Sequence, residues 1–231
     1  MQLGTQMIFQ DPSSSLNPRM RVRDIVGQAP RVHRMAPSAE IPALVDRYLG
    51  LAGIDPDVKD RFPHQFSGGQ RQRIGIARAL AVNPDMLVCD ESVAALDVSI
   101  QAQILNLFLD LRDQLGLTYL FISHDLSVVR HISDRVAVMY LGRLVEEAPS
   151  AELFRNAQHP YTRALLDEIP ELVPKRRNYG VIKGEIPSPL NPPSGCHFHP
   201  RCPFATERCR VEVPALRDVA PGHRSACHLN D

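Results

Sequence analysis

Residues 67–70, with the sequence Ser-Gly-Gly-Gln, have the types and order expected of a phosphate-binding turn. Glycine carries no side chain, so a ligand can approach the backbone closely at both central positions. The turn leads into a helical pattern with Ile74, Ala77 and Ala81 on one face. The first amides of a helix lack partners within the helix, and the helix dipole favours an anion at that end. Taken alone, however, the tetrapeptide is more simply a turn before a surface helix.

A second set of reactive side chains follows two apolar runs. Residues 86–89 (Met-Leu-Val-Cys) predict a buried parallel strand that ends in Asp90 and Glu91. Residues 118–122 predict another strand, which His124 follows closely. Open α/β sheets bind ligands at this edge, where one carboxylate can hold Mg²⁺ and another can orient or deprotonate water. Each residue also has a plainer role, since acids cap helices and a loop histidine is often merely hydrogen-bonded.

These side chains need a scaffold of strands and helices to position them. Between the two strands lies a long helical pattern, residues 100–115, with apolar side chains repeating on one face. From residue 85 to about residue 147 strands and helices alternate, which is typical of a parallel sheet. Residues 135–140 and 143–146 flank a Leu-Gly turn and predict a β-hairpin.

In this order and spacing, the motifs resemble the nucleotide-binding subunit of an ABC transporter. Residues 66–70 are similar to the signature motif, with Phe66 in place of the usual leucine. Residues 7–12 resemble the Q-loop, a strand that ends in glutamine. Two departures, Ser92 for proline and Ala-Ala at residues 94–95 where serine or threonine is common, remove no charged group. The site residues that the resemblance implies are Glu91 and His124 as catalytic groups, and Gln10, Ser67, Gly68, Gly69, Gln70, the Walker B acid Asp90 and the D-loop Asp97 as nucleotide-binding groups.

The resemblance implies two ATP-binding subunits that pair head to tail. Each ATP would lie between the P-loop of one subunit and the signature motif of the other, with Mg²⁺ as cofactor. Glu91 would polarise the attacking water, His124 would contact the γ-phosphate, and Gln10 would couple the site to the membrane subunits. Asp97 would link the two sites. The implied partners are a second ATPase subunit, identical or different, two integral membrane permeases and, indirectly, an extracytoplasmic solute-binding protein.

One motif of the family is missing from the 231 residues. A P-loop, G-x-x-x-x-G-K-[ST], places a lysine on the phosphates of the nucleotide. The chain has three lysines, Lys59, Lys175 and Lys183, and none follows a glycine. In the family the P-loop lies upstream of the Q-loop, so the chain resembles the C-terminal part of a longer subunit. We therefore expect it to complete a partner's ATP site, and to bind and hydrolyse ATP negligibly on its own.

Composition narrows the function class. Lysine plus arginine and aspartate plus glutamate number 26 each, so the net charge is zero and nucleic acid is not an expected partner. No apolar run reaches the roughly 20 residues that span a bilayer, and the N-terminus lacks the pattern of a signal peptide. Together with the resemblance, this predicts a protein at the cytoplasmic face of the membrane, bound peripherally through its partners.

The expected fold class is α/β, an incomplete ABC-type nucleotide-binding domain followed by a small cysteine-containing extension. The first domain is expected over residues 1–148. Within it we expect a Q-loop strand in residues 1–17, a helical subdomain in about 19–84 and a parallel sheet core in 85–148. Residues 149–231 form the expected extension.

The extension closely resembles the C-terminal region of oligopeptide and dipeptide transporter ATPases, at residues 159–161 (His-Pro-Tyr), 184–189 and 196–202. Its four cysteines are separated by five, six and seventeen residues. In a reducing cytoplasm, clustered cysteines favour a metal over disulfides. In the subfamily they can hold a [4Fe–4S] cluster, with zinc as the runner-up and four unligated thiols as the plain alternative. The candidate ligands are Cys196, Cys202, Cys209 and Cys227, with His197, His199, His223 or His228 for zinc; the fifth cysteine, Cys89, is expected in the core.

Two other function classes stay open. DNA-repair and chromosome-maintenance ATPases share the signature and Walker B motifs, but they usually carry long coiled coils, and this chain has no sustained heptads. The second alternative is a non-catalytic interaction fragment that binds an iron–sulfur cluster or zinc. For a transporter subunit, peptides are the expected cargo, with nickel or other small solutes as alternatives.

Overall fold

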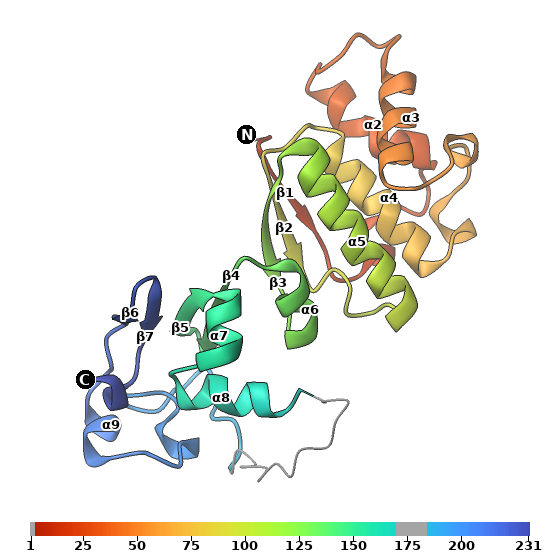
Figure 1. The fold of residues 1–231 in the computed structure, drawn as a ribbon. Helices are drawn as coiled ribbons and strands as arrows, with labels where there is room; N and C mark the ends of the chain where they lie inside the picture. The colour runs from red at the N-terminus through yellow and green to blue at the C-terminus, as the bar shows by residue number, and fades with distance from the viewer. Residues whose placement is uncertain (1–2, 170–183) are drawn as a thin grey trace. The chain divides into compact units, whose positions relative to one another are not determined.

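The computed structural model describes residues 3–169 and 184–231. The chain folds as two compact units, Met1–Asp125 and Leu126–Asp231, and each has its own sheet (Figure 1). This division differs from the domain boundary expected at residue 148, which rests on the resemblance and stays a prediction.

The first unit contains a three-stranded parallel sheet in the order β1–β2–β3. Ile8 pairs with Cys89, and Asp90 pairs with Ile122, so the three strands end at the same edge. Leu87 and Cys89 of the central strand are completely buried, as expected for a parallel sheet. The strands are β1 (Thr5–Ile8), β2 (Met86–Asp90) and β3 (Thr118–Ile122).

The helices of the first unit include two that flank β2 in sequence, α4 before it and α5 after it (Figure 1). Ile74, Ala77 and Ala81 are at most 1% exposed, which confirms the predicted apolar face of α4. Helix α5 buries Ile104 and Phe108 on the face predicted from its periodicity. The helices are α1 (Pro12–Ser15), α2 (Val22–Val32), α3 (Ile41–Leu51), η1 (Pro56–Val58), η2 (Pro63–Gln65), α4 (Gly68–Leu80) and α5 (Val98–Leu115).

Helices α2, α3 and α4 pack against one another. They lie within about residues 19–84, where a helical subdomain is expected, and the bounds of that subdomain stay a prediction. Val26 of α2 and Val45 and Leu49 of α3 are at most 1% exposed and form its centre. Within the described part of the chain, no helix is both long and apolar enough to cross a membrane.

The second unit contains a four-stranded antiparallel sheet in the order β4–β5–β7–β6. The predicted hairpin is confirmed: Leu141 and Gly142 join β4 to β5 with positive φ angles of 43° and 75°, as in a type I′ turn. Strand β5 also pairs with β7 of the extension, so β4 and β5 do not join the parallel sheet that was expected over residues 85–148. The two-residue turn forces them antiparallel, and β7 supplies their next neighbour. The elements are α6 (Leu126–Ile132), β4 (Arg135–Tyr140), β5 (Arg143–Pro149), α7 (Ser150–Asn156), α8 (Pro160–Asp167), η3 (His199–Arg201), α9 (Glu207–Val211), β6 (Arg217–Ala220), β7 (His223–Ser225) and η4 (His228–Asn230).

The core of the second unit is partly aromatic. Phe198 is 1% exposed, and its ring packs edge-on against Tyr140 with centroids 5.3 Å apart. Tyr161 of α8 contacts both rings. The segment that follows the undescribed residues therefore packs directly on the hairpin.

Candidate functional site

The carboxyl edge of the parallel sheet brings three expected site residues into contact. Gln10 follows β1, Glu91 follows β2 and His124 follows β3. The side-chain amide of Gln10 donates from Nε2 to Glu91 Oε2 at 2.6 Å, and His124 Nδ1 lies 2.9 Å from Glu91 Oε1. Residues far apart in sequence thus meet because three parallel strands end side by side.

Glu91 occupies a strained backbone conformation at this edge. Its φ of +44° lies in the left-handed region, which costs a non-glycine residue about 1–3 kcal/mol. Hydrogen bonds on both sides of the residue offset the strain: its N–H donates to the Ile122 carbonyl, and its carbonyl accepts from the Ala94 N–H, both at 3.0 Å. The side chain remains 29% exposed, so a ligand can reach the carboxylate.

The hydrogen bonds of Glu91 also fix which atoms face a ligand. An ionised carboxylate has no proton to donate, so His124 Nδ1 carries the hydrogen of that contact. Nε2 of His124 is left for a ligand, and the ring is 73% exposed. Gln10 uses its nitrogen on Glu91, which leaves its carbonyl oxygen available.

Asp90 is the last residue of β2 and is half-buried. Its carboxylate and the carbonyl oxygen of Gln10 are hard oxygen donors of the kind that Mg²⁺ prefers. The residues present at this edge therefore fit the cofactor that the resemblance implies.

The signature turn is organised as a capping box at the start of α4. The Ser67 hydroxyl accepts from the Gln70 N–H at 3.3 Å, and the Gln70 side-chain oxygen accepts from the Ser67 N–H at 3.0 Å. This arrangement leaves the amides of Gly68 and Gly69, and the hydroxyl hydrogen of Ser67, as donors at the helix N-terminus. Phe66, only 6% exposed, anchors the turn in the core.

The two glycines of the turn play different parts. A Cβ on Gly69 would lie 2.5 Å from Ile100 Cγ2, so this position lets α4 pack against α5. A Cβ on Gly68 would meet nothing closer than Leu96 Cδ2 at 4.0 Å, so this position is open to a ligand. From the sequence alone both glycines have the same predicted role, because the residue that packs on Gly69, Ile100, lies far away in the chain and has no local signature.

Asp97 and its neighbour are displayed to solvent. Asp97 precedes α5 with its side chain exposed and making no capping hydrogen bond. Val98, the next residue, is 83% exposed. The pair can contact another protein without any rearrangement of α5.

The four cysteines expected as metal ligands lie in the second unit. Across residues 3–169 and 184–231, no group of three or more His, Cys, Asp or Glu side chains is placed so that it could hold a metal ion. Burial raises the pKa of Cys202 to about 11 and also raises the pKa values of Cys196 and Cys227. As placed, the residues do not fit a cluster, and the iron–sulfur and zinc expectations stay predictions that rest on spacing and resemblance.

The histidines considered for zinc each have a partner of their own. His197 and His199 lie within hydrogen-bonding distance of backbone carbonyls, at 3.2 and 3.0 Å, and His228 Nδ1 lies 3.2 Å from an oxygen of Asp231. Cys89 is completely buried, and burial raises the pKa of its thiol to about 12. The expectation that Cys89 is a core residue is confirmed.

The sequence reasoning missed a buried carboxylate in the second unit. Glu146 is 0% exposed and lies 2.8 Å from His223 Nε2. Its oxygens also accept from the backbone N–H groups of Gln158, at 2.6 Å, and His159, at 3.0 Å. Burial lowers the pKa of His159 to about 4. The available signal was a glutamate directly after the apolar pair Leu144-Val145 in a predicted strand.

Comparison with known proteins decides the family. The model of the ABC transporter family matches residues 1–94, and the model described as "Oligopeptide/dipeptide transporter, C-terminal region" matches residues 145–209. The chain is 53% identical over 227 residues to the "Oligopeptide transport ATP-binding protein AppF" of Bacillus subtilis, covering 97% of this chain and 69% of that protein. The chain belongs to the oligopeptide/dipeptide ABC transporter ATP-binding family.

Further relatives of this ATP-binding family agree. The "Probable peptide ABC transporter ATP-binding protein y4tS" of Sinorhizobium fredii is 51% identical over 225 residues, covering 97% of this chain and 64% of that protein. The solved structure of cbiO1 from Clostridium perfringens, part of the ABC transporter complex cbiONQ, is similar with a TM-score of 0.61 and 32% identity, covering 67% of this chain and 60% of that chain. The expected ABC-type α/β fold is therefore confirmed.

The ABC transporter match begins at residue 1. It does not confirm the expectation that the chain lacks a P-loop part of a longer subunit, and that expectation stays a prediction. Within the 231 residues, no lysine follows a glycine.

Proposed function

We propose that this chain is an ATP-binding subunit of a peptide importer and that it acts through its signature side, on an ATP held by the P-loop of a partner subunit. One contrast carries the proposal. The turn at residues 67–70 is organised as an anion-binding helix N-terminus, whereas the 231 residues contain no P-loop lysine. The matching family and the relatives' names, which include oligopeptide transport, support the transport role.

The signature turn is the part of the ATP site for which this chain contains every expected residue. The amides of Gly68 and Gly69 and the hydroxyl of Ser67 donate to oxygens of the partner's γ-phosphate, and the dipole of α4 adds positive potential. The capping box holds these donors in place before the nucleotide arrives. Such preorganised donors stabilise developing negative charge more effectively than mobile ones do. Gln70 acts as the residue that locks the turn.

The carboxylate edge carries the groups for hydrolysis on this chain's own side. In the proposal Glu91 orients the attacking water and accepts its proton, and His124 contacts the γ-phosphate. Asp90 and Gln10 hold Mg²⁺, which supplies charge neutralisation at the phosphates when it is bound. Without a P-loop lysine no ATP is anchored beside these groups, so this edge is idle in the isolated chain.

The proposal places the chain at the cytoplasmic face of the membrane, in contact with two permease subunits and a second ATPase subunit, identical or different. Exposed Asp97 and Val98 are suited to the contact between the two ATPases. A solute-binding protein delivers the cargo from the other side. Peptides are the proposed cargo, because the relatives of this chain are named for peptide transport.

Isothermal titration of Mg-ATP into the 231-residue chain tests this proposal. We expect a Kd weaker than about 1 mM and negligible hydrolysis, because the phosphates lack a lysine and a glycine-rich cradle. Hydrolysis should appear when a P-loop-bearing subunit of the same family is added in equal amount. Stoichiometric micromolar binding by the isolated chain would overturn the proposal.

A further inference from the structure

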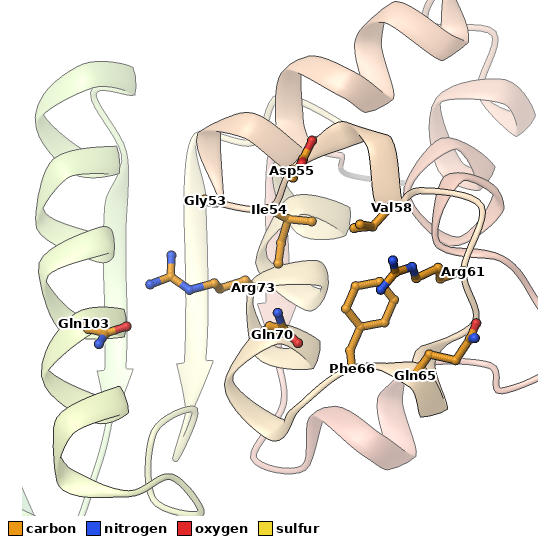
Figure 2. A pocket seen from close by; sticks show the side chains of 10 residues that line it. All are labelled: Gly53, Ile54, Asp55, Val58, Arg61, Gln65, Phe66, Gln70, Arg73 and Gln103. Carbon is orange, nitrogen blue, oxygen red and sulfur yellow. The ribbon is translucent and has the colours of Figure 1, made fainter.

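The first unit has a pocket of about 470 Å³ whose lining includes Gln70 of the signature turn (Figure 2). Its walls come from the loop after α3, from the segment between η1 and α4, from α4 itself and from α5. A volume of this size lies within the range of ligand-binding sites. Neither the phosphate donors of the turn nor the groups at the carboxylate edge need this space, so it is available for another role.

The amide side chains of the pocket present hydrogen-bond donors. Gln70 uses its carbonyl oxygen to accept from the Ser67 N–H, and Gln65 uses its own to accept from the Phe62 N–H at 2.9 Å. In each side chain the NH₂ group is therefore the end left for a ligand. These groups call for a ligand that is rich in acceptors.

Two arginines add charged donors to the lining. Arg73 is held in place, because its Nη1 donates to the Ala52 carbonyl at 2.9 Å and passes so close to Gly53 that a Cβ there would lie 2.6 Å from it. Its remaining N–H groups stay available to a ligand. In the part of the chain that the structure describes, no hydrogen bond or ion pair engages the side chain of Arg61, which is exposed.

The lining of the pocket also contains one acidic residue and several apolar side chains. Asp55 is the one acid among the lining residues, and its carboxylate already accepts from the Asp57 N–H at 3.0 Å. Figure 2 shows Arg73 reaching toward α5 on one side and Arg61 beside Phe66 on the other. Ile54 and Val58 lie between the two guanidinium groups. The pocket thus has a cation at each end and apolar side chains in the middle.

We propose that this pocket binds an acidic segment of a partner polypeptide, with carboxylates at Arg61 and Arg73 and an apolar side chain against Ile54 and Val58. Guanidinium groups pair with carboxylates through parallel hydrogen bonds, and the lining carries two cations against one acid. An extended peptide can place a carboxylate at each end of the pocket. The proposal does not depend on ATP binding by this chain.

The pocket also shares a residue with the signature turn. Gln70 lines the pocket and forms half of the capping box at Ser67. A bound segment that contacts the Gln70 amide therefore acts directly on the group that holds the phosphate donors. We expect peptide binding to shift the backbone amide resonances of Gly68 and Gly69 as well as those of the pocket.

A peptide titration followed by nuclear magnetic resonance tests the proposal on the full 231-residue chain. The probe is the capped pentapeptide Glu-Asp-Leu-Asp-Glu, and its control is the neutral analogue Gln-Asn-Leu-Asn-Gln. We expect saturable shifts at Gly53 and Gln103, and at least about tenfold weaker binding of the neutral peptide. Equal binding of the two peptides would overturn the proposal. So would inorganic phosphate that binds in the pocket more tightly than the acidic peptide.

Variants locate the binding within the pocket. The double change Arg61→Gln with Arg73→Gln should weaken binding at least about tenfold, and Gln103→Glu, on the exposed surface of α5, should weaken it in the same direction without touching the packing of Arg73. Arg47→Gln is the matched control, since it removes one exposed arginine from α3 outside the pocket. An equal loss in the Arg47→Gln variant, or no loss in Gln103→Glu and the double variant together, would contradict the assignment.

Discussion

Glu91 and Glu146 are both held by a histidine and by N–H donors, yet they differ in exposure and in the kind of donor that holds them. Glu91 is 29% exposed, and its partners Gln10 and His124 are side chains that can rotate away when a ligand arrives. Glu146 is 0% exposed, and besides His223 its donors are two backbone amides that cannot leave. The same residue types therefore make an exchangeable contact at the sheet edge and a permanent one inside the second unit. Exposure and the kind of donor, rather than residue type, distinguish the carboxylate that a ligand can reach from the carboxylate that is buried.

The largest expected effect is on the buried side of this comparison. Glu146→Ala leaves His223 and two backbone amides buried without an acceptor, and it should destabilise the second unit by about 3–5 kcal/mol. The neighbouring Glu147→Ala removes more exposed ion pairs to Arg135 and Arg224 and should cost about 1 kcal/mol or less. Urea unfolding, with hydrogen exchange in β5 and β7, measures both. Equal losses for the two variants would remove the distinction.

A pH titration tests how the buried His159, whose N–H donates to Glu146, contributes to the stability of the second unit. Burial lowers the pKa of His159 to about 4, so the unfolded chain binds a proton at pH 5 that the folded chain does not. Stability of the second unit should therefore fall as the pH drops from about 6.5 to about 4, by up to roughly 3 kcal/mol. His159→Asn keeps a capping acceptor for the Tyr161 N–H and should flatten this part of the profile. An unchanged slope in that variant would assign the acid sensitivity to another group.

A smaller effect distinguishes the two glycines of the signature turn. Gly69→Ala must push Ile100 away from α4 and should cost about 1–3 kcal/mol, whereas Gly68→Ala should leave the stability of the first unit nearly unchanged. Thermal unfolding of both variants measures the difference. If they unfold alike, the close approach of α4 and α5 does not depend on Gly69.

The cysteines of the second unit are tested by their reactivity and by the metal content of the protein. In metal-free protein at pH 7.5, iodoacetamide should modify Cys202 more slowly than free cysteine, because burial raises its pKa to about 11. If the cysteines hold the cluster that spacing and resemblance predict, anaerobically purified protein should contain iron and sulfide. The Cys202→Ser variant should lose both. Colourless protein without either element would contradict that prediction and leave the thiols as packing groups.

Much of the first unit could be predicted from the sequence, because its signals are local. The apolar face of α4, the strands β2 and β3 and the order of the motifs follow from periodicity and spacing. The meeting of Gln10, Glu91 and His124 follows from the rule that parallel strands end together.

The features that could not be predicted all depend on long-range pairing. Strand β5 pairs with β7 through residues far apart in the chain, such as Glu147 and Arg224, which are 77 positions apart, and no local sequence pattern predicts this pairing. Glu146 has a charged side chain, and it is buried only because His223 of β7 and the N–H of His159, before α8, bring hydrogen-bond donors to it. Gly69 resembles Gly68 until Ile100 is placed beside it.

In the proposed function, this chain works through its signature turn and not through its own carboxylate edge. ATP hydrolysis by this chain mixed with a P-loop-bearing subunit of the same family tests it most directly. The Gly68→Asp change places a negative charge beside the phosphate donors, so it should lower the rate of hydrolysis at least about 100-fold. The helix itself should tolerate the change, because an acidic side chain is favourable in the first turn of a helix. Glu91→Gln in this chain should change the rate by less than about twofold, because in the proposal the ATP is held by the partner and not beside Glu91. A rate abolished by Glu91→Gln and unaffected by Gly68→Asp would overturn the proposed function.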